Sequence, residues 1–283
     1  MITHNSDIRD TDSEQGAGMG QRDWVPDTID VNQPSMARMY DYALGGSHNF
    51  AVDREAAEKV LAANPDGRLG MFANRAFLRR AVRFMVGAGI TQFLDIGSGI
   101  PTAGNVHEVA QDANPDCRVV YVDVDPVAVL HGRRMLADNG RVTAIHSDIR
   151  DPERILANPD LLDLLDLNRP VGLLMLCVLH FVPDDQDPAG LVARYRDRLA
   201  PGSYLTISHV TGDDPSDTHQ EAMKTYSQVM TKVNLRSRDQ VAAMFDGFDL
   251  VDPGLVWIPR WRPDPGEDAS ATLYYYSGVG IKP

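Results

Sequence analysis

Residues 92–101 read Gln92-Phe93-Leu94-Asp95-Ile96-Gly97-Ser98-Gly99-Ile100-Pro101, a short apolar run that ends in a glycine-rich turn. A Gly-x-Gly turn directly after the first strand of a parallel sheet lets a ligand approach the backbone closely. The helix that follows has Asn105 as its predicted N-cap, and Glu108 three residues later completes a capping box. Because ligands of open α/β sheets bind at the carboxyl ends of the strands, this turn is the predicted centre of a binding site.

Apolar runs alternate with segments of helical length after this stretch. The runs lie at 118–122, 142–145, 171–177 and 203–207, and the helical segments lie near 105–113, 126–139, 152–165 and 187–200. Buried parallel strands read as continuous apolar runs, and the helices between them cover both faces of the sheet. A long helical region near 216–246 and two strands, around 250–256 and 273–279, complete the prediction. The predicted fold class is α/β with a mostly parallel sheet.

The residues before Gly89 have a different pattern. Residues 1–34 carry seven acids and two arginines without apolar periodicity, so we predict that at least residues 1–20 are a disordered tail. Between residues 35 and 89, apolar residues recur at spacings of three and four, which predicts an all-helical section. The chain thus divides into an acidic tail (1–34), a helical section (35–89) and an α/β domain (90–283).

The composition excludes several classes of protein and partner. The 283 residues carry a formal net charge of −13 and their arginines are scattered, so nucleic acid is not an expected partner. No apolar run approaches the roughly 18 residues that a membrane span requires, so we expect no membrane association. Cys117 and Cys177 are too few for a disulfide framework or a four-cysteine zinc site. The N-terminus lacks the pattern of a signal peptide, and we expect a cytoplasmic protein without a metal site.

Acidic residues accompany three consecutive predicted strands. Asp95 lies in the first strand, Asp123 ends the second and Asp148 ends the third. A carboxylate at the end of the second strand can accept both ribose hydroxyls of an adenosine, and one at the end of the third suits an adenine amino group. We therefore predict an adenosine-containing cofactor. Asp125 precedes Pro126 and is more naturally the N-cap of the next helix.

The same residues distinguish between adenosine cofactors. A dinucleotide fingerprint requires a third glycine at position 102, where this chain has Thr102. Asp95 suits a cationic ligand better than a pyrophosphate, because a carboxylate attracts an ammonium group. The Gly-Lys pair of a P-loop is absent from this turn. S-adenosylmethionine, which carries a sulfonium and an ammonium group, fits these residues better than NAD or ATP.

The strand-end motifs resemble those of class I S-adenosylmethionine-dependent methyltransferases, on the strength of Asp95–Gly99, Asp123 and Asp148-Ile149. More narrowly, the chain resembles an actinobacterial family of S-adenosyl methyltransferases whose substrates are largely unassigned. That similarity rests on residues 37–50, 74–78, 93–102, 105–108, 176–184, 208–209 and 252–254. The resemblance covers nearly the whole chain outside the acidic tail.

The resemblance implies a Rossmann-like, seven-stranded, mostly parallel sheet. Its last strand, 273–279, would be antiparallel, with 250–256 as its hairpin partner. The resemblance also implies that the helices of 35–89 fold over the cofactor as a lid.

The expected cofactor site combines the strand ends with this lid. Tyr40 and Asn49 are the candidate lid contacts, and Arg75 is a candidate bidentate partner of the methionine carboxylate. Alternatively, Tyr40 belongs to the core and Arg75 to a solvated helix face. The expected cofactor-binding residues at the strand ends are Asp95, Gly97, Ser98, Gly99, Asp123, Val124, Asp148, Ile149, Cys177 and Val178.

The fourth predicted strand leads into His180, the candidate catalytic residue. In class I methyltransferases this strand end borders both cofactor and acceptor, so His180 would orient or deprotonate the acceptor. The alternative is a hydrogen-bonded structural histidine, and Ser208-His209 at the end of the fifth strand is a weaker candidate. A strong base is not required, because the sulfonium is already activated and alignment of the reacting atoms supplies much of the rate.

We therefore expect an S-adenosylmethionine-dependent methyltransferase that acts on a small-molecule acceptor. Two alternatives remain open. One is a non-catalytic S-adenosylmethionine-binding module. The other is an NAD-dependent oxidoreductase, which rests only on the shared strand-turn-helix.

Overall fold

The computed structural model describes residues 30–64, 66–101, 104–213, 220–221, 224–225, 233–269 and 274–283. Residues 31–283 form one compact unit. The predicted acidic tail therefore lies outside the described residues, apart from its last five positions, and so does Thr102. Among the helices that these ranges contain, none is long and apolar enough to cross a membrane.

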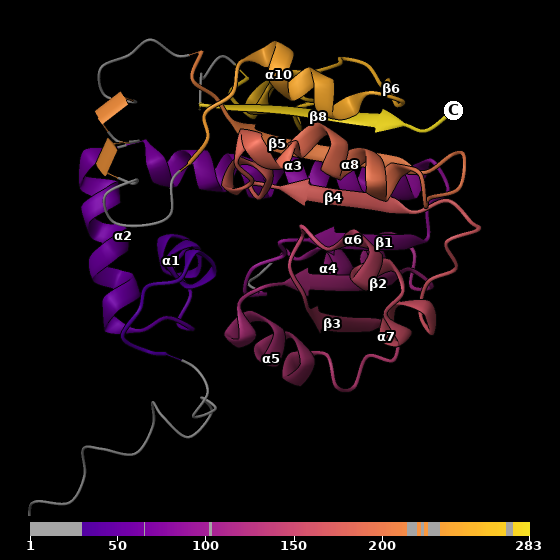
Figure 1. The fold of residues 1–283 in the computed structure, drawn as a ribbon, viewed down its shortest axis with the longest axis horizontal. Helices are drawn as coiled ribbons and strands as arrows, with labels where there is room; N and C mark the ends of the chain where they lie inside the picture. The colour runs from indigo at the N-terminus through magenta and orange to yellow at the C-terminus, as the bar shows by residue number, and fades with distance from the viewer. Residues whose placement is uncertain are drawn as a thin grey trace, which may run out of the picture. The chain divides into compact units, whose positions relative to one another are not determined.

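A single eight-stranded sheet organises the unit (Figure 1). Its strands are β1 (Gln92–Ile96), β2 (Arg118–Asp123), β3 (Val142–His146), β4 (Gly172–Leu176), β5 (Tyr204–Val210), β6 (Asp249–Leu250), β7 (Val256–Trp257) and β8 (Tyr275–Ile281). Their order is β3-β2-β1-β4-β5-β8-β6, and β7 also pairs with β8. β1 to β5 are parallel, whereas β8 runs antiparallel to β5, β6 and β7. The strand order reverses between β1 and β4, which places a topological switch point at their carboxyl ends.

The number of strands corrects one expectation: the resemblance implied a seven-stranded sheet, and the sheet formed by the described residues has eight strands. The predicted strand 250–256 is divided into β6 and β7, which pair with the two ends of β8. Pro253 lies between them, and a proline has no N–H to donate to a ladder, so the strand is interrupted there. The antiparallel last strand is confirmed, at 275–281 rather than 273–279.

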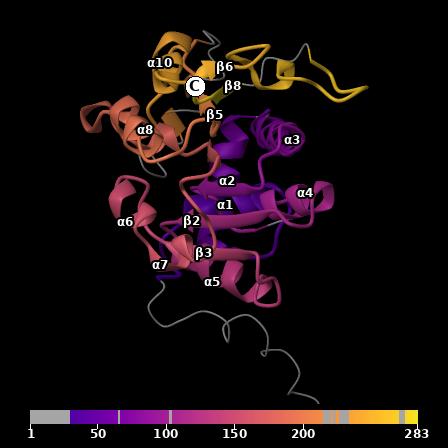
Figure 2. The ribbon, with the colours of Figure 1, turned by 90° about the vertical axis from the view of Figure 1, so that its right-hand side faces the viewer.

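Helices cover both faces of the sheet (Figure 2). One face carries α3 (Gly67–Gly87), α4 (Val106–Ala113) and α5 (Pro126–Met135), and the other carries α6 (Pro152–Leu156), α7 (Pro159–Leu162), α8 (Pro188–Arg196) and α10 (Arg238–Ala242). Short 3-10 turns are η1 (Leu179–Phe181), η2 (Asp184–Gln186), η3 (Ala243–Phe245) and η4 (Ile258–Arg260). Strand side chains alternate between two buried clusters: Leu94 and Ile96 pack on the α8 side and Phe93 packs on the α3 side.

Two predicted helices differ from the observed ones. The predicted helix 152–165 is divided into α6 and α7, because Asn158 caps a new helix and Pro159 takes its first position. Within the predicted helix 216–246, the structure has α10 and η3, while residues 233–235 are not helical. Much of the rest of that prediction lies outside the described residues.

The described residues of the section 35–89 are largely helical. It consists of α1 (Met36–Ala43), α2 (Ala51–Ala63) and the long α3. α1 and α2 lie beyond the carboxyl ends of the parallel strands, as Figure 1 shows. α3 extends from this region along the sheet, where Phe77 and Met85 are fully buried in the core. The section is therefore continuous with the core at one end and faces the strand ends at the other.

Candidate active site

The glycine turn after β1 packs tightly on one side and is open on the other. Gly97 and Gly99 both have positive φ, at 73° and 67°. A Cβ on Gly97 would lie 2.4 Å from Val178 Cγ2, whereas a Cβ on Gly99 would meet nothing within 4 Å. The N–H groups of Gly97 and Ser98 donate to the Val122 carbonyl, at 2.8 and 3.1 Å. The turn is thus held against β2 and against Val178 after β4, while the Cβ side of Gly99 is free of contacts with the described residues.

Asp123, at the end of β2, is hydrogen-bonded to this turn. Its Oδ2 accepts the Gly99 N–H at 2.7 Å, and its Oδ1 accepts the Asp125 N–H at 2.8 Å. Burial raises the pKa of Asp123 to about 6, although both N–H donors act in the opposite direction. The sequence placed Asp123 and Gly99 in one site, and the structure brings them together.

Asp95 and Arg75 approach the same turn from β1 and α3. Asp95 is buried, and burial raises its pKa to about 7, with Arg75 opposing the shift and Asp123 adding to it. Arg75 is half-buried, and it donates to the Gly104 carbonyl at 2.9 Å and to Asn105 Oδ1 at 3.1 Å. Arg75 therefore contacts the residues at the start of α4 and interacts electrostatically with Asp95, rather than projecting from a fully solvated helix face.

The third strand end is arranged differently. The Asp148 carboxylate is paired with the Arg150 guanidinium, which lowers the pKa of Asp148. An adenine amino group that bound Asp148 would have to share its carboxylate with Arg150. Val124 is 62% exposed beside Asp123, and Ile149 is half-buried against the core. These two side chains provide apolar surface near the ends of β2 and β3.

A relay of buried polar groups connects the end of β4 to α1. The Cys177 N–H donates to Ser208 Oγ at 3.0 Å, and the Ser208 hydroxyl donates to Asn74 Oδ1 at 2.7 Å. Asn74 Nδ2 donates to the Tyr40 hydroxyl at 3.1 Å, which donates in turn to the Met71 carbonyl at 3.2 Å. Tyr40 therefore takes part in a polar connection between the helical section and the sheet.

The relay also fixes the state of the Cys177 thiol. Because the only Ser208 hydroxyl proton is given to Asn74, the thiol is the donor in its 3.5 Å contact with Ser208 Oγ. Burial raises the pKa of Cys177 to about 12, which keeps the thiol protonated. Val178 packs against Gly97 of the glycine turn, and the adjacent Cys177 is an uncharged group.

His180 lies in η1, directly after β4, and is 6% exposed. Its ring packs edge-on against Phe181, and its centroid lies 5.6 Å from that of His209 on β5. Burial, then His209 and Arg236, lower the pKa of His180 well below its usual value. The imidazole is consequently neutral at neutral pH.

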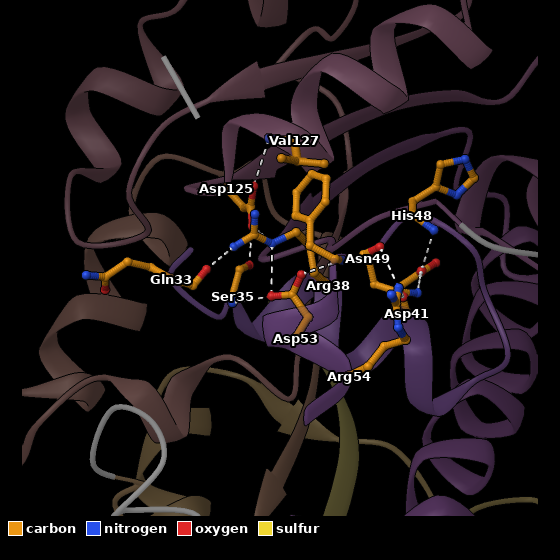
Figure 3. Close-up of polar contacts among 11 residues, drawn as sticks. Gln33, Ser35, Arg38, Asp41, His48, Asn49, Asp53, Arg54, Asp125 and Val127 are labelled. Atoms are coloured by element: carbon orange, nitrogen blue, oxygen red, sulfur yellow. Dashed lines mark hydrogen bonds and ion pairs between the residues drawn. The ribbon is translucent and has the colours of Figure 1, made fainter. Parts of the chain in front are cut away.

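Asp125 connects the end of β2 to the helical section (Figure 3). Its Oδ1 accepts the Val127 N–H at 2.7 Å, which confirms the predicted N-cap. Its Oδ2 accepts the Ser35 hydroxyl and lies 3.9 Å from Nε of the buried Arg38. Arg38 also pairs with the buried Asp53 at 3.2 Å. α1 and α2 are therefore attached beside the Asp123 site by a buried charge cluster.

Asn49 is bound within the helical section itself (Figure 3). Its Nδ2 donates to Asp41 Oδ2 at 2.9 Å and to the Gly46 carbonyl at 3.0 Å, and its Oδ1 accepts from Arg54 at 3.0 Å. Gly46 makes room for this arrangement, because a Cβ there would lie 2.0 Å from Asp41 Oδ1. Both hydrogens of Asn49 Nδ2 are used, so donation from this nitrogen to a cofactor would have to replace one of these bonds.

Sequence reasoning found part of this arrangement. The structure gathers Asp95, Asp123, Arg75 and the glycine turn at one point, while Asn49 and Asp148 are held by neighbouring side chains. The residues that were not predicted are Arg38, Asp53, Asn74 and Arg236. Asn74 could have been predicted from the sequence, because a polar residue on the apolar face of a predicted helix indicates a buried hydrogen bond. The other three are charged residues whose ion-pair partners lie 15 to 87 positions away in the sequence.

Comparison with known proteins identifies the family. The S-adenosyl methyltransferase family profile matches residues 22–283. The solved structure of a candidate methyltransferase from Thermobifida fusca YX is 38% identical, with a TM-score of 0.87 over 92% of this chain and 99% of that chain. A DUF574 family protein from Streptomyces avermitilis MA-4680 is 37% identical, with a TM-score of 0.85 over 89% of this chain and 99% of that chain.

A more distant structure agrees in fold. An O-methyltransferase family protein from Burkholderia thailandensis is 13% identical, with a TM-score of 0.52 over 82% of this chain and 61% of that chain. No curated protein gave a match. The Rossmann-like class I methyltransferase fold that the sequence predicted is confirmed, with eight strands. Because the family profile spans most of the chain, this chain belongs to the S-adenosyl methyltransferase family, and its cofactor is S-adenosylmethionine.

Proposed function

We propose that this protein transfers the methyl group of S-adenosylmethionine to a small-molecule acceptor at the carboxyl ends of β1, β2 and β4. The observation that carries the proposal is the pair of buried carboxyl groups, Asp95 and Asp123, beside the open face of Gly99. Burial raises the pKa of both carboxyls, so a cationic ligand that restores their charge would bind there favourably.

The residues at the turn fit the chemical groups of the cofactor. Asp95 would bind the ammonium group, and Arg75 would bind the carboxylate through its planar guanidinium. Asp123 would accept the ribose hydroxyls, and the exposed Val124 would provide apolar surface for the adenine. When bound, the cofactor supplies a methyl group on a positively charged sulfur.

The remaining expected residues are assigned by their position. Gly97, Ser98 and Gly99 would bring backbone close to the cofactor. Asp148 and Ile149 would border the adenine. Cys177 and Val178 would line the methionine side. Tyr40 and Asn49 would belong to the lid, where Tyr40 supports the end of β4 through Asn74 and Ser208.

On the acceptor side, we assign His180 as the catalytic residue. A neutral imidazole can hydrogen-bond an acceptor group and orient it toward the methyl carbon. Its pKa lies well below the usual value, so orientation is a better role for His180 than strong base catalysis. The helical section would exclude water from the strand ends, so that alignment in a dry site supplies much of the rate.

Calorimetry tests the binding part of the proposal. S-adenosylmethionine and S-adenosylhomocysteine should both bind, and NAD should not. Asp95→Asn and Asp123→Asn should weaken binding, whereas Asp116→Asn, whose side chain is 81% exposed, should not. Binding of NAD alone would overturn the proposal.

Turnover tests the transfer itself. Incubation with S-adenosylmethionine and a metabolite extract of small molecules should release S-adenosylhomocysteine. Loss of this release in His180→Gln, with cofactor affinity retained, would support the acceptor-side assignment. Binding of S-adenosylmethionine without release across a broad extract would instead identify a binding module without turnover.

A further inference from the structure

The turn that carries His180 is held by two side chains from the segment 233–237. Asn234 donates to the His180 carbonyl through its backbone N–H at 2.9 Å and its Nδ2 at 3.1 Å. Arg236 donates to the Leu179 carbonyl at 3.0 Å and to the Val182 carbonyl at 2.6 Å. Within the turn, the Leu179 carbonyl also accepts the Val182 N–H at 3.1 Å. The donors to the His180 and Val182 carbonyls come from the segment, so the segment fastens the turn.

The same guanidinium fixes the tautomer of His209. Arg236 Nη1 lies 2.9 Å from His209 Nε2, and a guanidinium has only donors, so Nε2 must be an acceptor. The proton of His209 is therefore on Nδ1, which lies 2.6 Å from the Val210 carbonyl and donates to it. Arg236 thus connects the η1 turn to a histidine of defined tautomer on β5.

The buried positive charge of Arg236 is compensated by an exposed carboxylate. Arg236 is 2% exposed, and its Nε and Nη2 donate to Asp184 Oδ1 at 3.0 and 2.7 Å. Asp184 is 68% exposed. The inner end of the guanidinium faces His209, and the outer end reaches a carboxylate at the surface.

His180 has a buried ring nitrogen without a partner. Its Nδ1 is inaccessible to solvent and makes no hydrogen bond with any described residue. Such an atom is rare in folded proteins and often marks a functional site. Among the described residues, the ionisable groups that face the two rings are the rings themselves, Arg236 from the segment 233–237, and Asp184 from η2.

We infer that Arg236 is a positioning residue for the acceptor side of the site: its hydrogen bonds to the η1 turn and to His209 Nε2 hold His180 in place as a neutral imidazole. This inference rests on the proposed role of His180. The charge of Arg236 supports it, because burial and this cation lower the pKa of both histidines, that of His209 to about 4. Asp184 opposes the shift of His209.

Two-bond proton–nitrogen spectra of the histidine rings test the inference directly. In the wild-type chain, with His180→Gln and His209→Gln used for assignment, His209 should carry its proton on Nδ1 from pH 5.5 to 8. His180 should remain neutral over the same range. A His209 with its proton on Nε2 could not accept from Arg236, and this result would overturn the inference.

Variants separate the charge from the hydrogen bonds. Arg236→Gln should raise the protonation midpoint of at least one of the two histidines by one pH unit or more, a tenfold change in its proton affinity. Arg236→Lys keeps the positive charge, so both histidines should stay neutral. A lysine cannot donate to every partner of the guanidinium, so kcat should fall at least tenfold, with little change in the KM for S-adenosylmethionine. Unchanged midpoints in Arg236→Gln, or full kcat in Arg236→Lys, would leave Arg236 with a structural role alone.

Arg80 provides the matched control. It is 5% exposed and donates to the carbonyls of Trp261 and Ile258 and to the Glu267 carboxylate. Arg80→Gln removes a comparable set of bonds and should leave the histidine midpoints unchanged. If Arg236→Gln does not fold, the wild-type tautomer and the kcat of Arg236→Lys still decide the question. The ring spectra can be recorded without turnover. If the wild-type spectra are as expected but no methyl transfer is detected, the proposed function is rejected, while the arrangement of Arg236 and the two histidines stands.

Discussion

The hydroxyl of Ser208 on β5 donates a 2.7 Å hydrogen bond to the side chain of Asn74 on α3, and both residues are buried. Asn74 Nδ2 in turn donates to the hydroxyl of Tyr40 on α1. The backbone of Cys177, at the end of β4, donates to the same Ser208 oxygen. One serine therefore ties the fourth and fifth strands to the helices that lie over the strand ends.

Replacing Ser208 should cost stability because it leaves buried partners unpaired. Ser208→Ala removes the donor to Asn74 Oδ1, and we expect a loss of about 1–3 kcal/mol in the free energy of unfolding, measured with urea. Asn74→Ala should cost a similar amount. Because the residues are in contact, the double variant should cost less than the sum of the two.

Ser277 is the matched control for this experiment. It pairs with Ser208 in the register of β5 and β8 and is equally buried, and its hydroxyl makes no hydrogen bond with any residue in the described ranges. Ser277→Ala should therefore change the free energy of unfolding by less than about 0.5 kcal/mol. Equal losses at the two serines would show that the relay does not stabilise the fold.

The two glycines of the turn should respond differently to an added methyl group. Gly97→Ala places a Cβ 2.4 Å from Val178 Cγ2 at a φ of 73°, which combines overpacking with backbone strain. We expect a loss of about 2–5 kcal/mol in unfolding free energy. The Cβ of Gly99→Ala would meet no atom of the residues that the structure describes, so only the cost of its positive φ, about 1–2 kcal/mol, should remain.

A second substitution separates these two terms. Val178→Gly removes both atoms that Gly97→Ala would meet, Cγ2 at 2.4 Å and Cβ at 2.7 Å, so the double variant should recover the overpacking cost and keep the backbone cost. Urea unfolding of the four proteins measures this. An equal loss from Gly97→Ala in both backgrounds would mean that the contact with Val178 does not decide the choice of glycine.

Cofactor affinity should increase with pH through the titration of Asp95. Burial raises the pKa of Asp95 to about 7, so the carboxyl is largely protonated in the free protein at pH 6. A cationic ligand favours the ionised form, so binding releases a proton below pH 7 and weakens as the pH falls, by up to about tenfold per pH unit. Calorimetry of S-adenosylmethionine at pH 5.5, 6.5 and 7.5, in two buffers of different ionisation enthalpy, measures both effects.

Asp95→Asn serves as the control for this pH dependence. The amide does not titrate, so the variant should bind more weakly at pH 7.5 and lose most of the dependence between pH 6.5 and 7.5. Asp123, whose pKa is raised to about 6, should account for the dependence that remains at lower pH. Proton release that is the same in Asp95→Asn as in the wild type would assign the titration to another group.

The sequence predicted the features whose causes are local. Continuous apolar runs predicted β1 to β5, and the Asp125-Pro126 pair predicted the start of α5, because strand burial and helix capping depend on neighbouring residues. The division into β6 and β7 was missed, although Pro253 lies within the predicted strand. Asp148 and Arg150 are two positions apart, so their pairing could have been predicted from the sequence as well.

Polar pairs between residues far apart in the sequence could not be predicted in this way. Arg38 lies 87 positions before Asp125 in the sequence, and Arg236 lies 52 positions after Asp184. A charged residue in a helical pattern is ordinarily assigned to a solvated face. Only the folded arrangement shows that these arginines are buried and paired, so the attachment of the helical section and the support of His180 emerged from the structure.

Arg38 should contribute strongly to the attachment of the helical section. Its side chain is 4% exposed and that of its partner Asp53 is fully buried, so Arg38→Met leaves a buried carboxylate without its cation. We expect a loss of about 3–5 kcal/mol in unfolding free energy at pH 7.5. The exposed pair of Arg83 and Asp264 is the matched control, and Arg83→Met should cost at most about 1 kcal/mol.

The pH dependence of this variant identifies the cause of its instability. Burial already raises the pKa of Asp53 above its usual value, and removal of Arg38 should raise it further. A raised carboxyl pKa favours the folded state at low pH, so the deficit of Arg38→Met should shrink as the pH falls from 7.5 to 5. Arg38→Met/Asp53→Asn should show a smaller, nearly pH-independent deficit, because no uncompensated charge remains. A deficit of Arg38→Met that stays constant with pH would instead assign the loss to packing of the arginine side chain against Phe50, whose ring centroid lies 4.9 Å from the guanidinium.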